Sequence, residues 1–228
     1  MPQKIVTLEN IGEVTLRRRK GSKHLRISVA AHSGVTVSMP SWSPYAAGIA
    51  FARSKTDWIV AQQNRTTPLQ PITHGSQIGK AHRVALSSAV GTSVRVKQSE
   101  ISGPLDASQK QLVSAAERAL RKQASVLLPK RLAQLAQNTD FTYAEVTIKK
   151  MHSRWGSCSN NGVICLNIYL VQLPWELIDY VLLHELTHTK HMNHSTSFWD
   201  TLTTHYPNTK QAKKILKTYP TQVVPLNL

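Results

Sequence analysis

The sequence predicts an α+β protein, in which a β-rich N-terminal region precedes a region where a histidine-bearing helix packs beside an antiparallel or mixed sheet. Three observations indicate this. Short β-branched or alternating segments fill most of residues 4–40. Residues from about 106 to 137 are rich in Ala, Leu, Gln and Lys, as long helices are. Gly103-Pro104 interrupts the chain between them, which predicts two regions, 1–104 and 105–228.

The N-terminal region begins with short segments typical of strands, separated by turn residues. These segments are residues 4–8, 13–19, 25–30 and 35–39. A helical stretch follows over residues 45–63. Its expected inward face consists of Ala50, Phe51, Trp58 and Ile59. Residues 70–100 return to strand, with 84–86 and 94–96 predicted to pair with each other.

The second region combines helices and strands. Residues 106–137 predict one long helix, or two that meet near Pro129. Residues 141–151 and 162–170 have the character of strands. Pro174 is suited to the first turn of the largely apolar helix that follows it. A last helix is expected over residues 209–218.

The apolar helix that starts near Pro174 carries the most informative pattern in the chain, His-Glu-Leu-Thr-His at 184–188. His184 and His188 lie one turn apart on the same helix face, so that two imidazole nitrogens can bind one metal ion. Glu185 lies about 100° around the helix, beside the ion, where a carboxylate can accept a proton from a water that the metal activates. A buried helix with two His and one Glu needs such a partner to offset desolvation.

A third ligand is needed for a catalytic metal with one open position. His194 can return to the ion only if the chain turns after His188, and Asn193 and His191 tolerate the left-handed conformation that such a turn uses. If the helix continued instead, His191 would approach the same face. We predict His194 as the ligand and assign His191 to the turn. Three imidazoles and an open position suit zinc.

Two further residues are candidates for stabilising the negative charge that develops during hydrolysis. Tyr180 lies four residues before His184, on the same helix face, although a tyrosine there also suits an apolar core. Arg154 precedes the strand expected at 162–170, and an ordinary loop arginine is the alternative. That strand directly precedes the metal helix. A sheet edge in this position lets an extended peptide add as a further strand.

Charge and composition set limits on the partners. The formal net charge of +16 is spread over both regions, and the densest run is Arg17-Arg18-Arg19-Lys20. Such a field favours phosphate-rich partners, although it also serves solubility alone. Trp42, Trp58 and Tyr45 are scattered along the sequence and predict no recognisable nucleic-acid module.

The expected compartment is the cytoplasm. The first residues lack the apolar segment of a secretory signal, and no run approaches the roughly 18 apolar residues of a membrane span. Cys158 and Cys165 are the two cysteines, and we expect them to be reduced. No membrane partner is predicted.

Several segments resemble a known family: residues 154–158, 166–167, 174, 180–188 and 193–199. They resemble the YgjP-like family of metal-dependent hydrolases, which is of zincin type and related to the SprT and WLM proteases. The resemblance covers nearly the whole chain. It implies a zincin-like catalytic domain with zinc on His184, His188 and His194 and with Glu185 as the base. Thr187 departs from the pattern, since a small residue is usual there.

The sequence therefore predicts a zinc metallopeptidase, with one zinc ion per chain, that cleaves a peptide or protein substrate. The alternative is a nucleic-acid-associated protein. In that case the basic surface binds DNA or RNA, and the chain is either a protease acting on DNA-bound proteins or a binding protein with a structural zinc.

Overall fold

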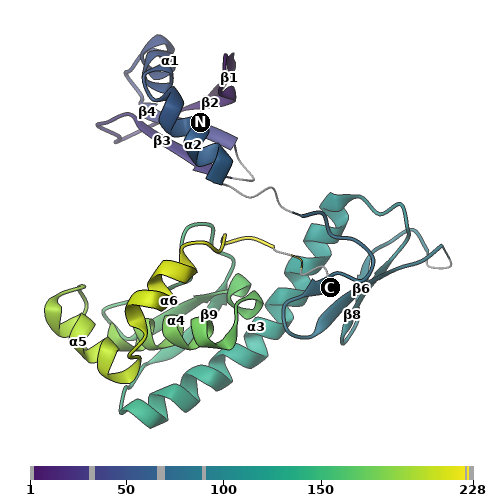
Figure 1. Ribbon diagram of the computed structural model, residues 1–228, viewed down its shortest axis with the longest axis vertical. Coiled ribbons are helices and arrows are strands. Elements are labelled where there is room, and N and C mark those ends of the chain that lie inside the picture. Colours follow the sequence, from purple (N-terminus) through teal and green to yellow (C-terminus); the bar gives the residue numbers. More distant parts are fainter. Residues whose placement is uncertain (1–2, 31–33, 66–69, 89–90, 224, 226–228) are drawn as a thin grey trace. The chain divides into compact units, whose positions relative to one another are not determined.

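The computed structural model describes residues 3–30, 34–65, 70–88, 91–223 and 225, and the protein is α+β, as predicted (Figure 1). The chain divides into two compact units, an N-terminal unit, Met1–Leu69, and a C-terminal unit, Gln70–Leu228. The boundary that the sequence suggested lies at residues 104 and 105. The structure instead groups the strands between residues 70 and 104 with the long helix that follows them.

The N-terminal unit is a four-stranded sheet with two helices. Its elements are β1 (Gln3–Leu8), β2 (Gly12–Arg19), β3 (Arg26–Ala30), β4 (Gly34–Pro40), α1 (Tyr45–Arg53) and α2 (Thr56–Arg65). The strand order is β1-β2-β4-β3, with β2 and β4 parallel and the other pairs antiparallel. Val14, Leu16 and Val37 from the sheet form a core with Ala52 and Ile59 from the helices. Strands found here match the four segments predicted from the sequence.

The helical stretch predicted over residues 45–63 is two helices, and its predicted inward face is wrong in part. The side-chain hydroxyls of Ser54 and Thr56 donate to the carbonyls of Phe51 and Arg53, which ends α1 and begins α2. This break changes the helical phase. Ile59 is buried as expected, but Trp58 is 47% exposed, and Ala50 of α1 is exposed as well.

The C-terminal unit begins with a second sheet that packs on a long helix. Its strands are β5 (Gln77–Ile78), β6 (His82–Leu86), β7 (Arg95–Val96) and β8 (Glu100–Gly103), in the order β5-β6-β8-β7. β8 lies between β6 and β7, so the pairing predicted between residues 84–86 and 94–96 is wrong. Ile78, Val84 and Ile101 share one core with the long helix. This shared core explains why residues 70–104 belong to the C-terminal unit.

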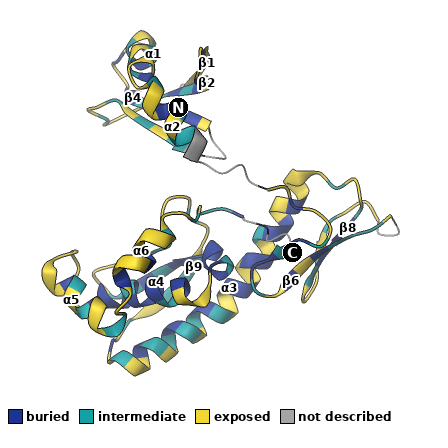
Figure 2. Ribbon diagram, viewed as in Figure 1, coloured by how far each residue is buried: buried dark blue, intermediate teal, exposed yellow. Residues whose placement is uncertain are grey.

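The long helix, α3 (Gln109–Thr139), runs without interruption through Pro129. It begins with a capping box between Ser108 and Gln111, and it ends at Asp140, whose φ of 53° is left-handed. Figure 2 shows buried residues along one side of α3 and exposed residues along the other. Of the helices in the described ranges, none combines the length and the apolar character needed to cross a membrane.

A third sheet and four short helical elements complete the C-terminal unit. They are β9 (Glu145–Lys149), β10 (Gly156–Cys158), β11 (Val163–Asn167), the 3-10 helix η1 (Ile168–Gln172), α4 (Trp175–Thr187), α5 (Thr196–His205) and α6 (Thr209–Leu216). The order is β10-β11-β9, with β10 antiparallel and β9 parallel to β11. β10 and α5 were not predicted. β11 is central, and β10 rather than β11 is the edge strand beside α4.

Candidate active site

The helix α4 places the His-Glu-Leu-Thr-His motif in its last turn. It packs against α3, α5, α6 and β10, and it is buried along most of its length. Arg131 of α3 donates two hydrogen bonds to the Asp179 carboxylate, with the shorter ion-pair distance at 2.6 Å. A half-buried bidentate pair of this kind fixes the position of one helix against the other. The motif is therefore held on a rigid element.

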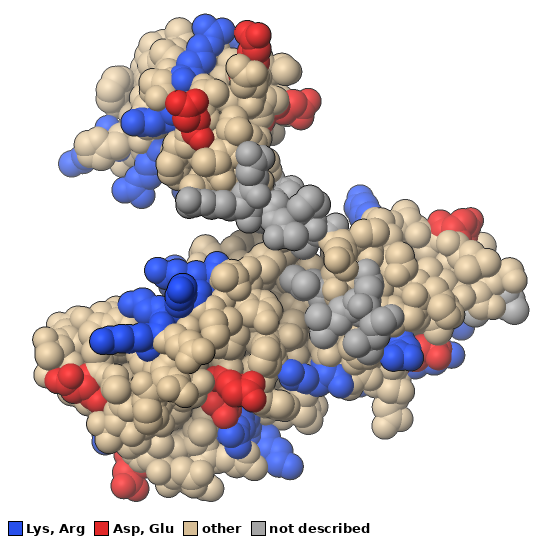
Figure 3. All heavy atoms as spheres, viewed as in Figure 1, with Lys and Arg blue, Asp and Glu red and all other residues tan. Residues whose placement is uncertain are grey.

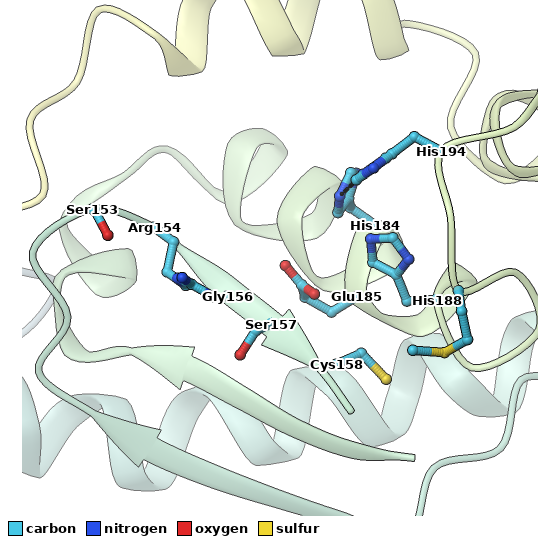
Figure 4. A pocket seen from close by; sticks show the side chains of 10 residues that line it. Ser153, Arg154, Gly156, Ser157, Cys158, His184, Glu185, His188 and His194 are labelled. Carbon is cyan, nitrogen blue, oxygen red and sulfur yellow. Dashed lines mark hydrogen bonds between the residues drawn. The ribbon is translucent and has the colours of Figure 1, made fainter. Parts of the chain in front are cut away.

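Three imidazole rings converge at the end of α4, as Figure 4 shows. They belong to His184, His188 and His194, and one ligand nitrogen from each lies within 4.8 Å of the others. The Nε2 atoms of His184 and His194 are 3.1 Å apart. Two nitrogens bound to one tetrahedral zinc at about 2.0–2.1 Å would lie roughly 3.3 Å apart. The spacing of the rings suits such an ion.

The chain turns after α4 without the left-handed residue that we expected. In the described ranges, Asn10 and Asp140 are the residues other than Gly with positive φ, and neither Asn193 nor His191 is among them. Instead, Thr189 and Lys190 donate backbone hydrogen bonds to the carbonyls of Leu186 and Thr187. A tighter 3-10-like turn thus satisfies the free carbonyls at the helix end.

This turn separates the roles of two histidines. The carbonyl of His191 accepts a hydrogen bond of 3.0 Å from Nδ1 of His188, which leaves the Nε2 of His188 free for a metal. The His191 ring itself points to α5, where its Nε2 lies 3.1 Å from the Thr201 hydroxyl. The structure therefore brings His194, and not His191, to the motif.

The helix α5 packs against the three imidazole rings. Phe198 is fully buried, and its ring centroid lies 4.9, 4.6 and 4.7 Å from those of His184, His188 and His194. Trp199 stacks on His194 with centroids 5.5 Å apart. These contacts order the rings before any ligand binds, which reduces the entropy cost of forming the site.

The His184 ring has the protonation state that a metal ligand requires. Burial, together with the neighbouring His188, His194 and Lys213, lowers the pKa of His184 to about 3, so the ring is neutral as a ligand must be. Its Nδ1 is buried without a hydrogen-bond partner in the described residues, and its Nε2 faces another imidazole. A cation between the Nε2 atoms of His184 and His194 would bind the lone pairs of both rings where they face each other.

Glu185 lies against the strand β10 rather than in solvent. It is 5% exposed, and burial raises its pKa to about 8, although Arg154 acts in the opposite direction. A Cβ built on Gly156 of β10 would lie 2.6 Å from Oε1 of Glu185 and 2.7 Å from its Cγ. Only glycine at position 156 allows the carboxylate to occupy this place. Nothing in the spacing of the motif indicated this contact.

An open cavity of about 460 Å³ joins these groups (Figure 4). It is lined by the three His, Glu185, the strand β10 and Arg154, which is exposed at the rim. Tyr180 does not line it. Instead, this tyrosine is 3% exposed and borders an adjoining cavity of about 210 Å³, together with Arg154, Glu185 and Leu216. Burial raises the pKa of Tyr180 to about 12, so that its hydroxyl keeps its proton.

Asn167, at the end of β11, holds the segment that carries Arg154. Its fully buried amide donates hydrogen bonds of 2.8 Å to the carbonyls of Met151 and Arg154. Sequence reasoning gave this residue no role, because its partners are 13 and 16 residues away along the chain. A buried amide with several backbone partners fixes a loop more firmly than packing alone does.

The two cysteines are free and lie on opposite faces of the sheet. Cys158 pairs with Ile164 across the strands, whereas Cys165 pairs with Ser157, and side chains alternate between faces along a strand. Burial and the nearby Glu185 raise the pKa of the Cys158 thiol. In the described part of the chain, the residues whose ligand atoms converge are the three His, and Cys158 is not among them.

Three convergent imidazoles and a buried carboxylate at an open cavity, on a helix beside a mixed sheet, define a metal-dependent hydrolase. The comparison with known families agrees. The chain belongs to the YgjP-like family, whose model, described as "YgjP-like, metallopeptidase domain", matches residues 23–219.

The solved structures that are similar to part of the chain include the following two. Both are metallopeptidase zymogens. Abylysin of Pyrococcus abyssi is 24% identical with a TM-score of 0.38, over 40% of this chain and 93% of its own. Jannalysin of Methanocaldococcus jannaschii is 24% identical with a TM-score of 0.35, over 40% of this chain and 94% of its own. None of the curated proteins matches this sequence.

Proposed function

We propose that the protein is a zinc-dependent peptidase of zincin-like architecture in which His184, His188 and His194 hold the ion. The observation that carries this proposal is the convergence of three imidazole nitrogens on an open cavity. Imidazole ligands suit zinc, whereas Mg²⁺ and Ca²⁺ prefer oxygen. When bound, zinc polarises a carbonyl and lowers the pKa of a water toward about 7.

Glu185 is the general base in this proposal. Its carboxylate faces the cavity between the three rings and β10, within reach of a water that attacks a bound peptide (Figure 4). An Oε atom accepts the proton of that water and later returns it to the leaving amine. A bound cation would lower the raised pKa of Glu185, because it favours the charged carboxylate. This base has no use in a structural zinc site, so the buried Glu185 favours the catalytic alternative.

The strand β10 provides the place for the substrate backbone. It has β11 on one side and no strand on the other within the described sheet, and its residues line the cavity. An extended peptide that adds to this free edge would bring its scissile carbonyl beside the metal ligands and Glu185. The sequence assigned this role to the strand at residues 162–170, but β11 is central and cannot fulfil it.

Arg154 is the better of the two candidates for stabilising the negative charge on the substrate carbonyl. It lies at the rim of the cavity, and Asn167 fixes the backbone that carries it. Tyr180 is buried behind Glu185, in the adjoining cavity. We therefore assign the charge-stabilising role to Arg154, and we assign Tyr180 to the wall of the site.

The test is the metal dependence of proteolysis. The purified protein should contain one zinc ion per chain and should cleave an unstructured protein such as casein. A chelator should abolish cleavage, and added zinc should restore it. If a preparation shown by elemental analysis to be free of metal cleaved casein at the same rate, the proposed function would be wrong.

A further inference from the structure

A cationic cavity of about 480 Å³ lies in the N-terminal unit, outside the site described above. Its lining includes four cations, Arg19, Lys20, Lys23 and Arg26, and the hydroxyl residues Ser22 and Ser38. Among the residues that the structure describes, those that line this cavity include no acidic side chain. The peptidase proposal makes no use of these residues, although they include the densest basic run of the sequence.

Strand order brings these cations together. β2 ends at Arg19, opposite Pro40 of β4, and β3 begins at Arg26, opposite Ser38 of the same strand. Because β4 lies between β2 and β3, the loop that joins them must cross the end of β4, and Gly21 adopts a φ of 82° in this loop. Cations from two strands and one loop therefore surround the same sheet end.

These like charges have no compensating partner in the described part of the unit. In its described residues, neither ion pairs nor side-chain hydrogen bonds engage Arg19, Lys20, Lys23 or Arg26. The whole stretch from residue 1 to 69 has ten Lys and Arg against three Asp and Glu. Clustered like charges repel one another and lower the stability of the fold. A bound anion would remove this repulsion.

A second cavity adjoins the first and has a different lining. It measures about 500 Å³ and shares Arg26 with the cationic cavity. Phe51 and Trp58 line it together with Leu25, Ile27 and Lys55. Trp58, at 47% exposed, presents part of its ring to solvent there. Trp58 is far from Arg26 along the sequence, so only the fold reveals that an aromatic ring borders the cations.

We propose that these two cavities form a binding site for nucleotides of a single-stranded nucleic acid. The phosphates bind to the cationic cavity, and a base stacks on Trp58 in the adjoining one. Cations that follow a backbone beside an exposed aromatic ring are the combination with which proteins bind single strands. An acidic peptide has no planar base to occupy the aromatic cavity. A membrane surface would engage a protruding apolar side chain such as Trp42, which is 77% exposed and lines neither cavity.

The experiment measures the binding of a fluorescein-labelled DNA single strand of about 12 nucleotides to the full chain, by fluorescence anisotropy at several salt concentrations. The test variants are R19Q/R26Q, which removes two cations of the site, and W58L, which removes the ring. The control K4Q/R53Q removes the same charge from exposed residues that line neither cavity. Circular dichroism confirms that each variant is folded.

We expect R19Q/R26Q to weaken binding at least about tenfold and to reduce the slope of log K against log salt by about 1.4, or roughly 0.7 for each lost contact. W58L should weaken binding at least about fivefold with the salt slope unchanged, because stacking releases no counterions. K4Q/R53Q should bind within about twofold of the wild type, since long-range charge alone changes affinity little at moderate salt.

Equal loss of affinity in R19Q/R26Q and K4Q/R53Q would overturn the proposal, because a diffuse basic surface would then explain the binding. The proposal would also be overturned if the wild type did not bind the strand, or if W58L bound it as tightly as the wild type. Binding of polyglutamate or phosphatidylserine vesicles with the same affinity, and with the same dependence on Trp58, would overturn it too. If a nucleoside triphosphate displaced the strand at a concentration equal to that of the strand phosphates, the ligand of the site would be a free nucleotide rather than a strand. None of these results depends on peptidase activity.

Discussion

At the scale of single residues, the proposed site depends on the absence of a side chain at position 156. The carboxylate of Glu185 lies where a Cβ on Gly156 would come within 2.6–2.8 Å of three of its atoms. Contacts this short force a neighbour to move, and Glu185 is buried by α4 and β10 together. The addition of a single methyl group at position 156 should therefore displace the carboxylate of Glu185 without contacting the metal ligands.

The variant Gly156→Ala tests this contact. We expect it to fold and to bind zinc like the wild type, but to lose on the order of 10²-fold in kcat/KM, as misplacement of a catalytic group by about 1 Å does. Gly91→Ala is the control, because a Cβ there meets no described residue within 4 Å. Wild-type rates in Gly156→Ala would show that the position of Glu185 does not matter.

The third ligand is the other question at this scale. His194→Ala should weaken zinc binding by orders of magnitude, because its Nε2 lies 3.1 Å from that of His184. His191→Ala should leave zinc binding almost unchanged, because the backbone carbonyl of residue 191 accepts the hydrogen bond from His188. Competition with a chelating dye measures both affinities. The opposite order would mean that the turn after α4 has been assigned wrongly.

The motif itself predicted where His184, Glu185 and His188 would lie, because helix geometry fixes neighbours three and four residues apart. The prediction that His194 lies beside the motif required the chain to turn after His188. The chain does turn there, but without the left-handed residue that we expected. Gly156 and Asn167 could not be found in this way. Their roles depend on contacts between elements that are distant in the sequence, and such contacts leave no periodic pattern.

At the scale of elements, one buried amide, that of Gln123, strengthens the link between the second sheet and α3. The Gln123 Oε1 accepts hydrogen bonds from the backbone of Lys80 and Ala81, and its Nε2 lies 2.9 Å from Nδ1 of His82. The other His82 nitrogen donates to the Lys97 carbonyl at 3.2 Å. Since Nδ1 accepts a hydrogen bond from Gln123, this arrangement requires neutral His82.

The stability of the protein should therefore depend on pH through His82. Burial lowers the pKa of His82 from 6.5 in the folded state. Above pH 6.5 the His82 ring is neutral in both the folded and the unfolded chain. Below pH 6.5 the unfolded chain binds the proton first, so the free energy of unfolding falls as the pH falls toward the pKa of the folded state. The difference in unfolding free energy between wild type and His82→Gln, measured with urea, should shrink from pH 7.5 to about 5. A difference that stayed constant with pH would contradict this role.

Most elements were predictable because their patterns are local. The strands of the N-terminal unit show alternation or β-branching, and α3 shows its helical composition. β10 is three residues long and α5 has polar residues in its first turn, so neither has a clear pattern. The order β5-β6-β8-β7 was also unpredictable, because the parallel pairing of β6 with β8 depends on the surface of α3 rather than on a turn.

At the scale of the whole molecule, the site lies entirely in the C-terminal unit. Its ligands, base and supporting residues come from β10, β11, α4 and α5 and the segments that connect them. The sheet of residues 77–103 covers part of the apolar face of α3, and Ile78, Val84 and Ile101 share one core with Leu112 and Leu120. A domain that began at residue 105, as the sequence predicted, would lack the sheet that buries these apolar residues of α3.

Two fragments test this division. Residues 70–228 should unfold cooperatively in urea and bind zinc, because they contain the complete core of the unit. Residues 105–228 should unfold without cooperativity or aggregate, since the exposed face of α3 leaves a large apolar surface in water. Circular dichroism and elemental analysis measure both properties. A stable, zinc-binding 105–228 fragment would support the boundary that the sequence first suggested.

The most direct test of the proposed function is Glu185→Gln. The amide keeps the size of the side chain but cannot accept a proton from water at neutral pH. We expect this variant to fold and to hold zinc like the wild type, and to cleave casein slower by about 10²–10⁴-fold, the share of general-base catalysis. Glu176→Gln, a change to an exposed glutamate in the first turn of α4, should cleave like the wild type. Equal cleavage by wild type and Glu185→Gln, with equal zinc content, would contradict the role of Glu185 as the base.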